Sequence, residues 1–455
     1  MPRSGATLHA AAPTDLPRRP RGDAEAAGPT RRCRALPPGP RAGVAVISAR
    51  PERNEDRAAL WTVFAVVVVD LVGFGIVMPV LPFYARDLGA SATTLGLLLT
   101  CHSAAQLAFA PLWGRVSDRM GRRPVLLFTI AGTAAALLLL GLARTISGLF
   151  LARLLSGAFA ANVSVASAYI ADTTPAEERT RWMGLLGASF GIGFLIGPAI
   201  GGALSPFGYR VPLLFGAGLA AVNWIFAFTS LREPKRLAAD AEGMAGRSLA
   251  PLRDPAVRRI CVTNFVLSLA VTQLETVFAF FMLDRFGYDA QHVAAILVGM
   301  AVVMGAVQGG AMRSLSVRFE ERALVGAGAL LLAVACPAIP EAWNVAVLLV
   351  PLAISAVGRG IAQPALMSLV SLGAAPRERG AVMGVFQASA SLARVVGPVL
   401  AGALYDVRGA LPFWLAGALV AAVAASRGRL PARSGGAGAA AAALPEAGSS
   451  GLSEN

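Results

Sequence analysis

Apolar segments long enough to cross a membrane dominate this chain. Twelve of them follow one another along the 455 residues, and each can span the ~30 Å hydrocarbon core of a bilayer as a helix. With 56% hydrophobic and 15% charged residues, the composition excludes an ordinary soluble domain. We therefore expect an all-α polytopic membrane protein. Its transmembrane helices are predicted over residues 60–84, 92–113, 124–143, 147–170, 182–204, 211–231, 257–283, 291–313, 322–340, 344–370, 381–405 and 410–427.

An internal repeat with an offset of 200 residues relates the two halves of the chain. The segment 179–204 recurs as 379–404, with Arg, Met-Gly, Ala-Ser and Gly-Pro in register. Chance matches of Ala and Gly do not explain that combination. The repeat predicts two six-helix bundles of like orientation, with a substrate site at their interface and alternating access by rocking.

The predicted helices and the repeat divide the chain into five parts. The first bundle covers residues 59–231 and the second covers residues 257–427, with a linker at 232–256 between them. The terminal segments 1–58 and 428–455 have no continuous apolar core, and we expect them to be disordered tails.

Positive charge is distributed unevenly between the two predicted membrane faces. The net charge of +14 could indicate nucleic-acid binding, but most of the 40 Lys and Arg residues lie in the N-terminal tail or in loops on its side. Positive loops remain in the cytoplasm, so we expect a multi-pass inner-membrane protein with both termini cytoplasmic and no nucleic-acid partner. Basic residues on the opposite side are Arg86, Arg144, Arg210, Arg285 and Arg408.

A charged hairpin over 114–124 separates two of the predicted helices. Gly114 and Gly121 would permit tight turns, and Asp118 could meet the positive N-terminus of a facing helix. Breaking and remaking that contact would gate access. An arginine-rich topogenic loop explains the basic residues but not Asp118. The predicted gating residues are Gly114, Asp118, Arg119, Gly121, Arg122 and Arg123.

Two acids, Asp70 and Glu275, fall inside predicted helices, where an ionised group needs a partner or a function. Asp70 could carry a proton, and Arg153 lies at a similar depth, so a pair between them is expected; a static salt bridge is the alternative. Glu275 could bind a proton or a cation, or remain protonated. Arg359 and Arg394 could pair with Glu275, could bind an anionic or zwitterionic group, or could have a purely structural role.

Polar side chains within the helices are candidates for a substrate cavity. His102 among them is as consistent with packing as with titration. The candidates are His102, Gln106, Asn162, Gln273, Gln363, Gln387 and Arg394. A glycine-rich face of the fifth helix would let helices pack closely and control leak through the cavity. Its residues include Gly193, Gly197, Pro198, Gly201 and Gly202.

Motifs of other protein classes are absent from the sequence. It has no G-x-x-x-x-G-K-[ST], no G-x-S-x-G and no H-E-x-x-H, and its four cysteines form no metal-ligand spacing. We therefore expect no enzyme activity, no metal and no cofactor. Transport would draw on the proton gradient. The expected partners are a small-molecule substrate, protons and the lipid bilayer, with the monomer as the functional unit.

Residues 60–427 resemble the major facilitator superfamily, and within it the drug:proton antiporters, in particular the tetracycline efflux group. The hairpin 114–124, Arg153 with Gly157, and the segment 186–202 are similar to its motifs. The resemblance implies that Asp70 and Arg153 serve proton transfer and that the fifth-helix glycines mark antiport. The acids that the tetracycline group carries in helices 3 and 9 are absent, and Arg359 stands where a small residue is expected.

These features predict a proton-coupled exporter of a drug-like small molecule. Exchange or efflux of a small metabolite, such as a sugar or an amino acid, is the alternative within transport. A non-transporting membrane sensor on the same fold is the alternative from another class, and a membrane enzyme is a third, for which no nucleophile–base set is visible.

Overall fold

The computed structural model describes residues 50–234, 250–373 and 378–431, and regular secondary structure within these ranges is helical throughout. The predicted tails lie outside the described residues over 1–49 and 432–455, as does the centre of the linker, 235–249. Residues 50–58, expected to belong to the N-terminal tail, instead form the beginning of the first helix.

The first half contains seven helices and one short 3-10 turn. They are α1 (Arg50–Asp87), α2 (Ala92–Met120), α3 (Arg122–Leu142), α4 (Ile146–Phe159), α5 (Asn162–Thr173), α6 (Ala176–Leu204), η1 (Ser205–Phe207) and α7 (Arg210–Ser230). The second half follows the same plan. Its elements are η2 (Ala250–Arg253), α8 (Pro255–Phe286), α9 (Ala290–Ala306), the π-helical η3 (Val307–Ala311), α10 (Met312–Arg318), α11 (Glu321–Ala338), α12 (Val345–Gly373), α13 (Arg379–Val407), α14 (Leu411–Ser426) and η4 (Arg427–Arg429).

Eleven helical segments of the described chain are long and apolar enough to cross a membrane. The joined pairs α4–α5 and α9–α10 each count as one span, and the shorter apolar helix α14 occupies the place of the twelfth. This agrees with the expected polytopic, all-α fold with twelve transmembrane helices.

The fourth expected span, 147–170, is not one continuous helix. It breaks at Ala160 and Ala161, between α4 and α5. Two side chains of α2 bind carbonyls next to the break: Trp113 Nε1 donates to the carbonyl of Ala158 at 2.7 Å, and Gln106 Nε2 donates to that of Ala160 at 3.2 Å. These donors satisfy backbone groups that a break inside a membrane would otherwise leave unpaired.

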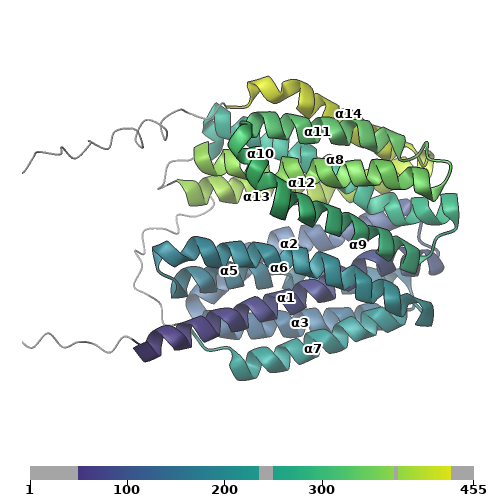
Figure 1. Ribbon diagram of the computed structural model, residues 1–455. Coiled ribbons are helices and arrows are strands. Elements are labelled where there is room, and N and C mark those ends of the chain that lie inside the picture. Colours follow the sequence, from purple (N-terminus) through teal and green to yellow (C-terminus); the bar gives the residue numbers. More distant parts are fainter. Residues whose placement is uncertain (1–49, 235–249, 374–377, 432–455) are drawn as a thin grey trace, which may run out of the picture. The chain divides into compact units, whose positions relative to one another are not determined.

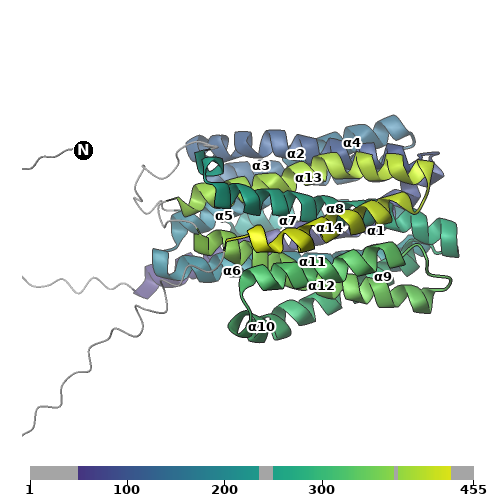
Figure 2. The same ribbon diagram turned by 90° about the horizontal axis from the view of Figure 1, so that it is seen from above.

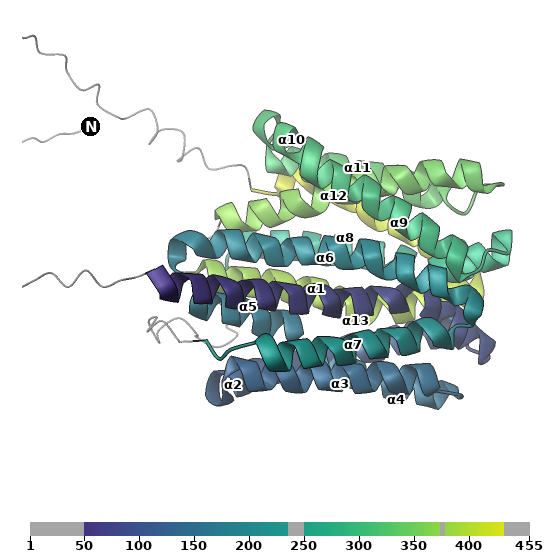
Figure 3. The same cartoon turned by 60° about the horizontal axis from the view of Figure 1, so that its bottom comes forward.

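The 200-residue repeat has a direct structural counterpart. Helices α6 and α13 both contain 29 residues and occupy equivalent places in the two halves. Helix α6 packs against α1 of its own half and α9 of the other, as α13 packs against α8 and α2. The two halves are the purple-to-teal and the green-to-yellow helices of Figure 1. Figure 2 shows α2 with α13, and Figure 3 shows α1 with α6.

Candidate functional site

The helices have two ends that differ in charge and contacts. We call the end that carries the α2–α3 turn at Gly121 and the beginning of α8 the basic end, and the end that carries the α1–α2 turn at Gly89 the opposite end. Contacts between the two halves concentrate at the opposite end. There Arg86 Nη2 of α1 lies 2.6 Å from Asp284 Oδ1 of α8, and its guanidinium lies 5.0 Å from the ring centre of Phe280.

A second contact between the halves joins the ends of α13 and α2. The carboxylate of Asp406 accepts hydrogen bonds from the backbone N–H of Ala92 at 3.1 Å and of Thr93 at 2.9 Å, and from the Thr93 hydroxyl at 2.6 Å. The two N–H groups belong to the first turn of α2, where they have no intrahelical partner and form the positive end of the helix dipole. An acid of one half therefore caps a helix of the other half.

Glycines bring the backbones of the two halves together just inside these caps. A Cβ on Gly96 would lie 2.2 Å from the carbonyl oxygen of Pro398, and one on Gly402 would lie 2.2 Å from that of Ala92. Thr100 Oγ1 donates to the carbonyl of Val395 at 2.7 Å. Close backbone approach of this kind requires small residues. The backbones of the two halves are therefore in close contact within the helical turns nearest the opposite end.

The charged hairpin at the basic end differs from the expected loop over 114–124. Gly114 lies within α2, which continues to Met120, and α3 begins at Arg122, so Gly121 alone makes the turn. Gly121 has φ +102°, and a Cβ there would lie 2.7 Å from Glu233 Oε1. The expectation of a turn at Gly121 is met, and that at Gly114 is wrong because the helix extends through it.

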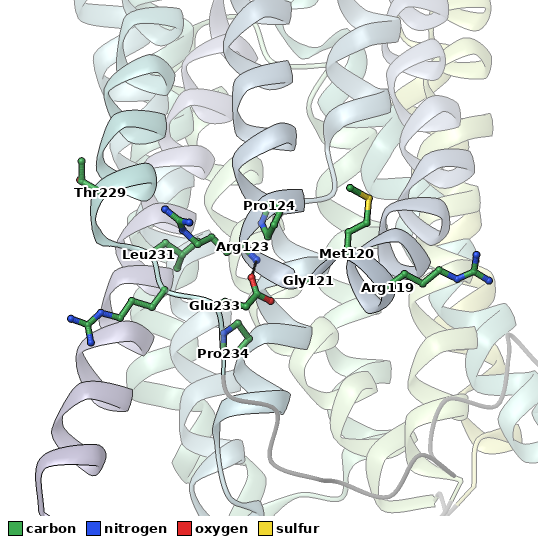
Figure 4. Close-up of a pocket in the computed structure, with 10 residues that line it drawn as sticks. Arg119, Met120, Gly121, Arg123, Pro124, Thr229, Leu231, Glu233 and Pro234 are labelled. Carbon is green, nitrogen blue, oxygen red and sulfur yellow. Dashed lines mark hydrogen bonds between the residues drawn. The ribbon is translucent and has the colours of Figure 1, made fainter.

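Glu233 at the start of the linker caps α3. Its two carboxylate oxygens accept the backbone N–H of Arg122 at 2.6 Å and of Arg123 at 2.9 Å. Figure 4 shows this carboxylate turned toward Arg123. The surrounding cavity of about 770 Å³ is also lined by Arg119, Met120 and Arg232. The carboxylate of Glu233 thus joins the start of the linker to the α2–α3 turn.

Arg122 is the centre of a buried charge network at this end. Its Nη1 lies 2.6 Å from Asp118 Oδ1 and 2.6 Å from the Ser117 hydroxyl, and its Nε lies 2.8 Å from Asp172 Oδ2 of α5. Asp118 therefore contacts an arginine of its own motif, whereas the sequence suggested a facing helix N-terminus. One buried cation holds α2, α3 and α5 together.

Asp70 lies about halfway along α1 and is partly exposed. Its Oδ1 accepts a hydrogen bond from Asn162 Nδ2 of α5 at 2.7 Å. Within the described part of the chain, Asp70 makes no ion pair, and the buried Nε of Arg153 has no hydrogen-bond partner. The expected pair between Asp70 and Arg153 is not formed in this structure; the carboxylate binds the amide of Asn162 at the start of α5.

Glu275 is paired in the second half. Its Oε1 lies 2.6 Å from Arg359 Nη1 of α12, and each of the two side chains is 38% exposed. Arg394 of α13 is near enough to interact electrostatically with Glu275, and its Nη2 donates to the Ser391 hydroxyl at 3.0 Å. The possibility that Arg359 forms an ion pair with Glu275 is therefore confirmed.

The glycines of α6 divide into two sets. Gly193, Gly197 and Gly201 face α1; an added Cβ on Gly197 would lie 2.5 Å from the Cα of Gly75. Gly202 faces the other half, where its Cβ would lie 2.3 Å from that of Ala294. Close packing by these glycines and Pro198 agrees with the expectation.

Three of the predicted cavity residues are buried between helices. Gln273 donates to the carbonyl of Gly397 at 3.1 Å, Asn162 binds Asp70, and His102 packs 5.9 Å from the ring of Phe74. These side chains thus join neighbouring helices in this structure, and their role in a substrate cavity stays a prediction. Gln106 is engaged at the α4–α5 break. Gln363 is partly buried, and Gln387 and Arg394 are exposed.

Sequence reasoning missed the residues that join the halves and the linker: Arg86, Asp284, Asp406 and Glu233. Arg86, Asp284 and Asp406 lie near the C-terminal ends of their helices, and Glu233 lies in the linker just after α7. The sequence does not show which distant element each of them contacts. The position of Asp406 three residues after Ala403 in the repeat, with no acid at the equivalent position 206, was the available signal.

Comparison with known proteins places the chain in a family. The model of the Major Facilitator Superfamily matches residues 63–371 and 311–444. The chain is 34% identical to the class D tetracycline resistance protein of Salmonella ordonez, over 74% of this chain and 86% of that protein. It is 29% identical to multidrug resistance protein 1 of Bacillus subtilis (strain 168), over 76% and 90% of the two chains.

Solved structures show the same architecture. The human organic anion transporter MFSD10 (TETRAN) has a TM-score of 0.62 and 26% identity, over 82% of this chain and 99% of that one. A bacterial homolog of the human lysosomal transporter Spinster, in an inward-facing and unoccupied conformation, has a TM-score of 0.68 and 18% identity, over 84% and 93%. Taken with the twelve-helix fold and its repeat, these matches establish that the chain is a multi-pass membrane transporter of the Major Facilitator Superfamily and not an enzyme.

Proposed function

We propose that this protein exports a drug-like small molecule in exchange for protons by alternating access. The observation that carries the proposal concerns Asp70, an acid at mid-membrane depth. Its carboxylate accepts a hydrogen bond from the neutral amide of Asn162. A carboxylate held by an amide can accept a proton without first breaking an ion pair. Because charged groups at this depth are costly, an unpaired acid is best explained by function.

The distribution of contacts supports alternating access. The halves are held together at the opposite end by Arg86 with Asp284 and by Asp406 with the start of α2. If the basic end is cytoplasmic, as the positive loops indicate, this arrangement corresponds to a conformation open toward the cytoplasm. Exchange of these contacts for others at the basic end would open the other side.

The relatives support a class of substrate. Proteins named for tetracycline and multidrug resistance match most of this chain at about 30% identity. We infer that the substrate is likewise a drug-like compound, that the protein resides in the inner membrane with cytoplasmic termini, and that it works as a monomer without cofactor.

Proton movement in inverted membrane vesicles tests this function. Vesicles with an acidic lumen and a pH-sensitive dye receive a panel of drugs that includes tetracyclines, for the wild type and Asp70→Asn. We expect at least one compound to release protons from the lumen, and Asp70→Asn to abolish the release at equal protein level. Asp254→Asn is the matched control, because Asp254 caps α8 at the basic end and lies outside the bundle interior. Absence of any response to the panel contradicts drug–proton antiport.

A further inference from the structure

The second half carries a positive group at mid-membrane depth that the proposed proton coupling does not use. Arg394 lies roughly halfway along the 29 residues of α13, about 20 Å from either end of the helix. At that depth its guanidinium cannot reach a membrane interface by snorkelling. The side chain is exposed, and an arginine in hydrocarbon is strongly unfavourable, which favours a position facing water rather than lipid.

Arg394 retains most of its capacity to bind a ligand. A guanidinium carries five N–H donors, and the hydrogen bond described for this side chain is the one from Nη2 to Ser391 Oγ at 3.0 Å. Within the described ranges no ion pair joins Arg394 to a carboxylate. Glu275, with which Arg394 interacts electrostatically, lies 2.6 Å from Arg359. Together Glu275, Arg359 and Arg394 carry a net charge of +1.

The internal repeat shows that this charge is specific to the second half. The position equivalent to Arg394 in the first half is Phe194, whose ring lies 6.3 Å from that of Phe74 in an edge-to-face arrangement. Phe74 is 37% exposed and belongs to the same helix as Asp70. The first half therefore presents aromatic surface where the second half presents a cation.

We propose that the exported substrate is an aromatic compound with an acidic group, and that Arg394 binds this group while the aromatic body lies against Phe74 and Phe194. The inference rests on the proposed efflux function and names its substrate class. An arginine can bind a carboxylate through two parallel hydrogen bonds, which gives both affinity and orientation. The Glu275–Arg359 pair limits the excess positive charge to one, which fits a single acidic group.

Binding of a matched pair of fluorescent probes tests the inference without transport. Pyrene-1-butyrate and its amide have the same aromatic body and differ in one negative charge. We expect purified wild-type protein in detergent to bind the acid at least about tenfold more tightly than the amide, and Arg394→Gln to remove this preference by raising the Kd of the acid alone. Arg394→Lys should retain part of the preference, because the charge remains while the paired hydrogen bonds are lost.

The control is Arg408→Gln, in a residue of the same half that stacks over Trp414 at the opposite end and should leave both Kd values unchanged. The thermal unfolding midpoint of each variant shows whether it folds. Equal binding of acid and amide by the wild type, no binding of either, or an acid preference that persists in Arg394→Gln overturns the inference.

Failure of this inference is separable from failure of the proposed function. Proton release in vesicles that is triggered by cationic or neutral drugs, and is unchanged by Arg394→Gln, contradicts the acidic substrate class while drug–proton antiport stands. Acid-selective binding that depends on Arg394, together with no proton release by any drug, supports the binding site and contradicts antiport.

Discussion

Asp406 of α13 accepts hydrogen bonds from both the backbone N–H and the hydroxyl of Thr93 in α2, at 2.9 and 2.6 Å. The two residues are separated by 313 positions in the sequence and belong to different halves of the transporter. A helix cap is ordinarily a local interaction with the chain just before the helix. Here it joins the two bundles, so its formation depends on how the bundles are placed.

Removal of this cap should favour separation of the halves at the opposite end. Asp406→Ala leaves the first N–H groups of α2 without their acceptor from α13, at a cost of about 1 kcal/mol to the closed arrangement. We expect the separated population to increase about fivefold. Spin labels at Arg144→Cys and Trp343→Cys, in the loops of the two halves at this end, report their distance once the four native cysteines are replaced by serine.

Asp289→Ala is the control for that experiment. Asp289 accepts hydrogen bonds from Gln291 and His292 at the start of its own helix α9, so its loss should not shift the distance between the labels. An unchanged distance distribution in Asp406→Ala would show that the cap does not contribute to closure.

The ion pair between Arg86 and Asp284 should contribute less than the Asp406 cap. Its side chains are 39% and 36% exposed, and exposed pairs typically contribute about 0–1 kcal/mol and weaken with salt. Arg86→Gln should increase the separated population by less than Asp406→Ala, with a difference that diminishes between low and high ionic strength. A larger, salt-independent effect of Arg86→Gln would reverse this ranking.

Gly96 should be sensitive to the smallest substitution. A Cβ at this position would lie 2.2 Å from the carbonyl oxygen of Pro398, and overpacking of this kind costs about 1–3 kcal/mol. Gly96→Ala should therefore disfavour closure at the opposite end and reduce turnover. Gly218→Ala in α7 has no atom within 4 Å of the new methyl group, lies outside the predicted site residues and is the matched control. Equal transport rates for the two variants would contradict the close contact.

Glu233 should stabilise the first half through the N-terminus of α3. Glu233→Ala leaves the N–H groups of Arg122 and Arg123 without their acceptor, which we expect to reduce stability by about 1 kcal/mol. The control is Glu178→Ala, which removes an exposed pair with Arg57 at 3.6 Å. Thermal unfolding of the detergent-solubilised protein measures both. A midpoint as high for Glu233→Ala as for Glu178→Ala would argue against a structural role of the cap.

The fold could be predicted from the sequence because its determinants are regular. Helix length is fixed by membrane thickness, and the 200-residue repeat is visible in residues such as Arg179 and Arg379. Local departures from regular helices were harder to predict from the sequence. The break lies at two alanines, three residues after Gly157, and the side chains that bind carbonyls beside it, Trp113 and Gln106, come from another helix.

The candidate site was predicted less completely than the fold. Intramembrane charges such as Asp70 and Glu275 are identifiable because apolar surroundings make them rare. Their partners are not, since Asn162 and Arg359 were two among several polar residues at similar depth. The residues that join the halves were harder to identify: Asp406 lies in the last turn of its own helix, where a carboxylate has no N–H group to cap, but the sequence does not show which helix N-terminus it meets.

Gradient-driven accumulation by the purified protein in liposomes tests the central claim most directly. The labelled compound is the one that releases protons from vesicles, and the liposomes have an acidic lumen. The account predicts that wild-type protein accumulates the compound against its own gradient. Asp70→Asn should still exchange external for internal compound but should not accumulate it, because substrate passage remains while proton coupling is lost. Accumulation by Asp70→Asn at the wild-type level would contradict the role of Asp70 in coupling.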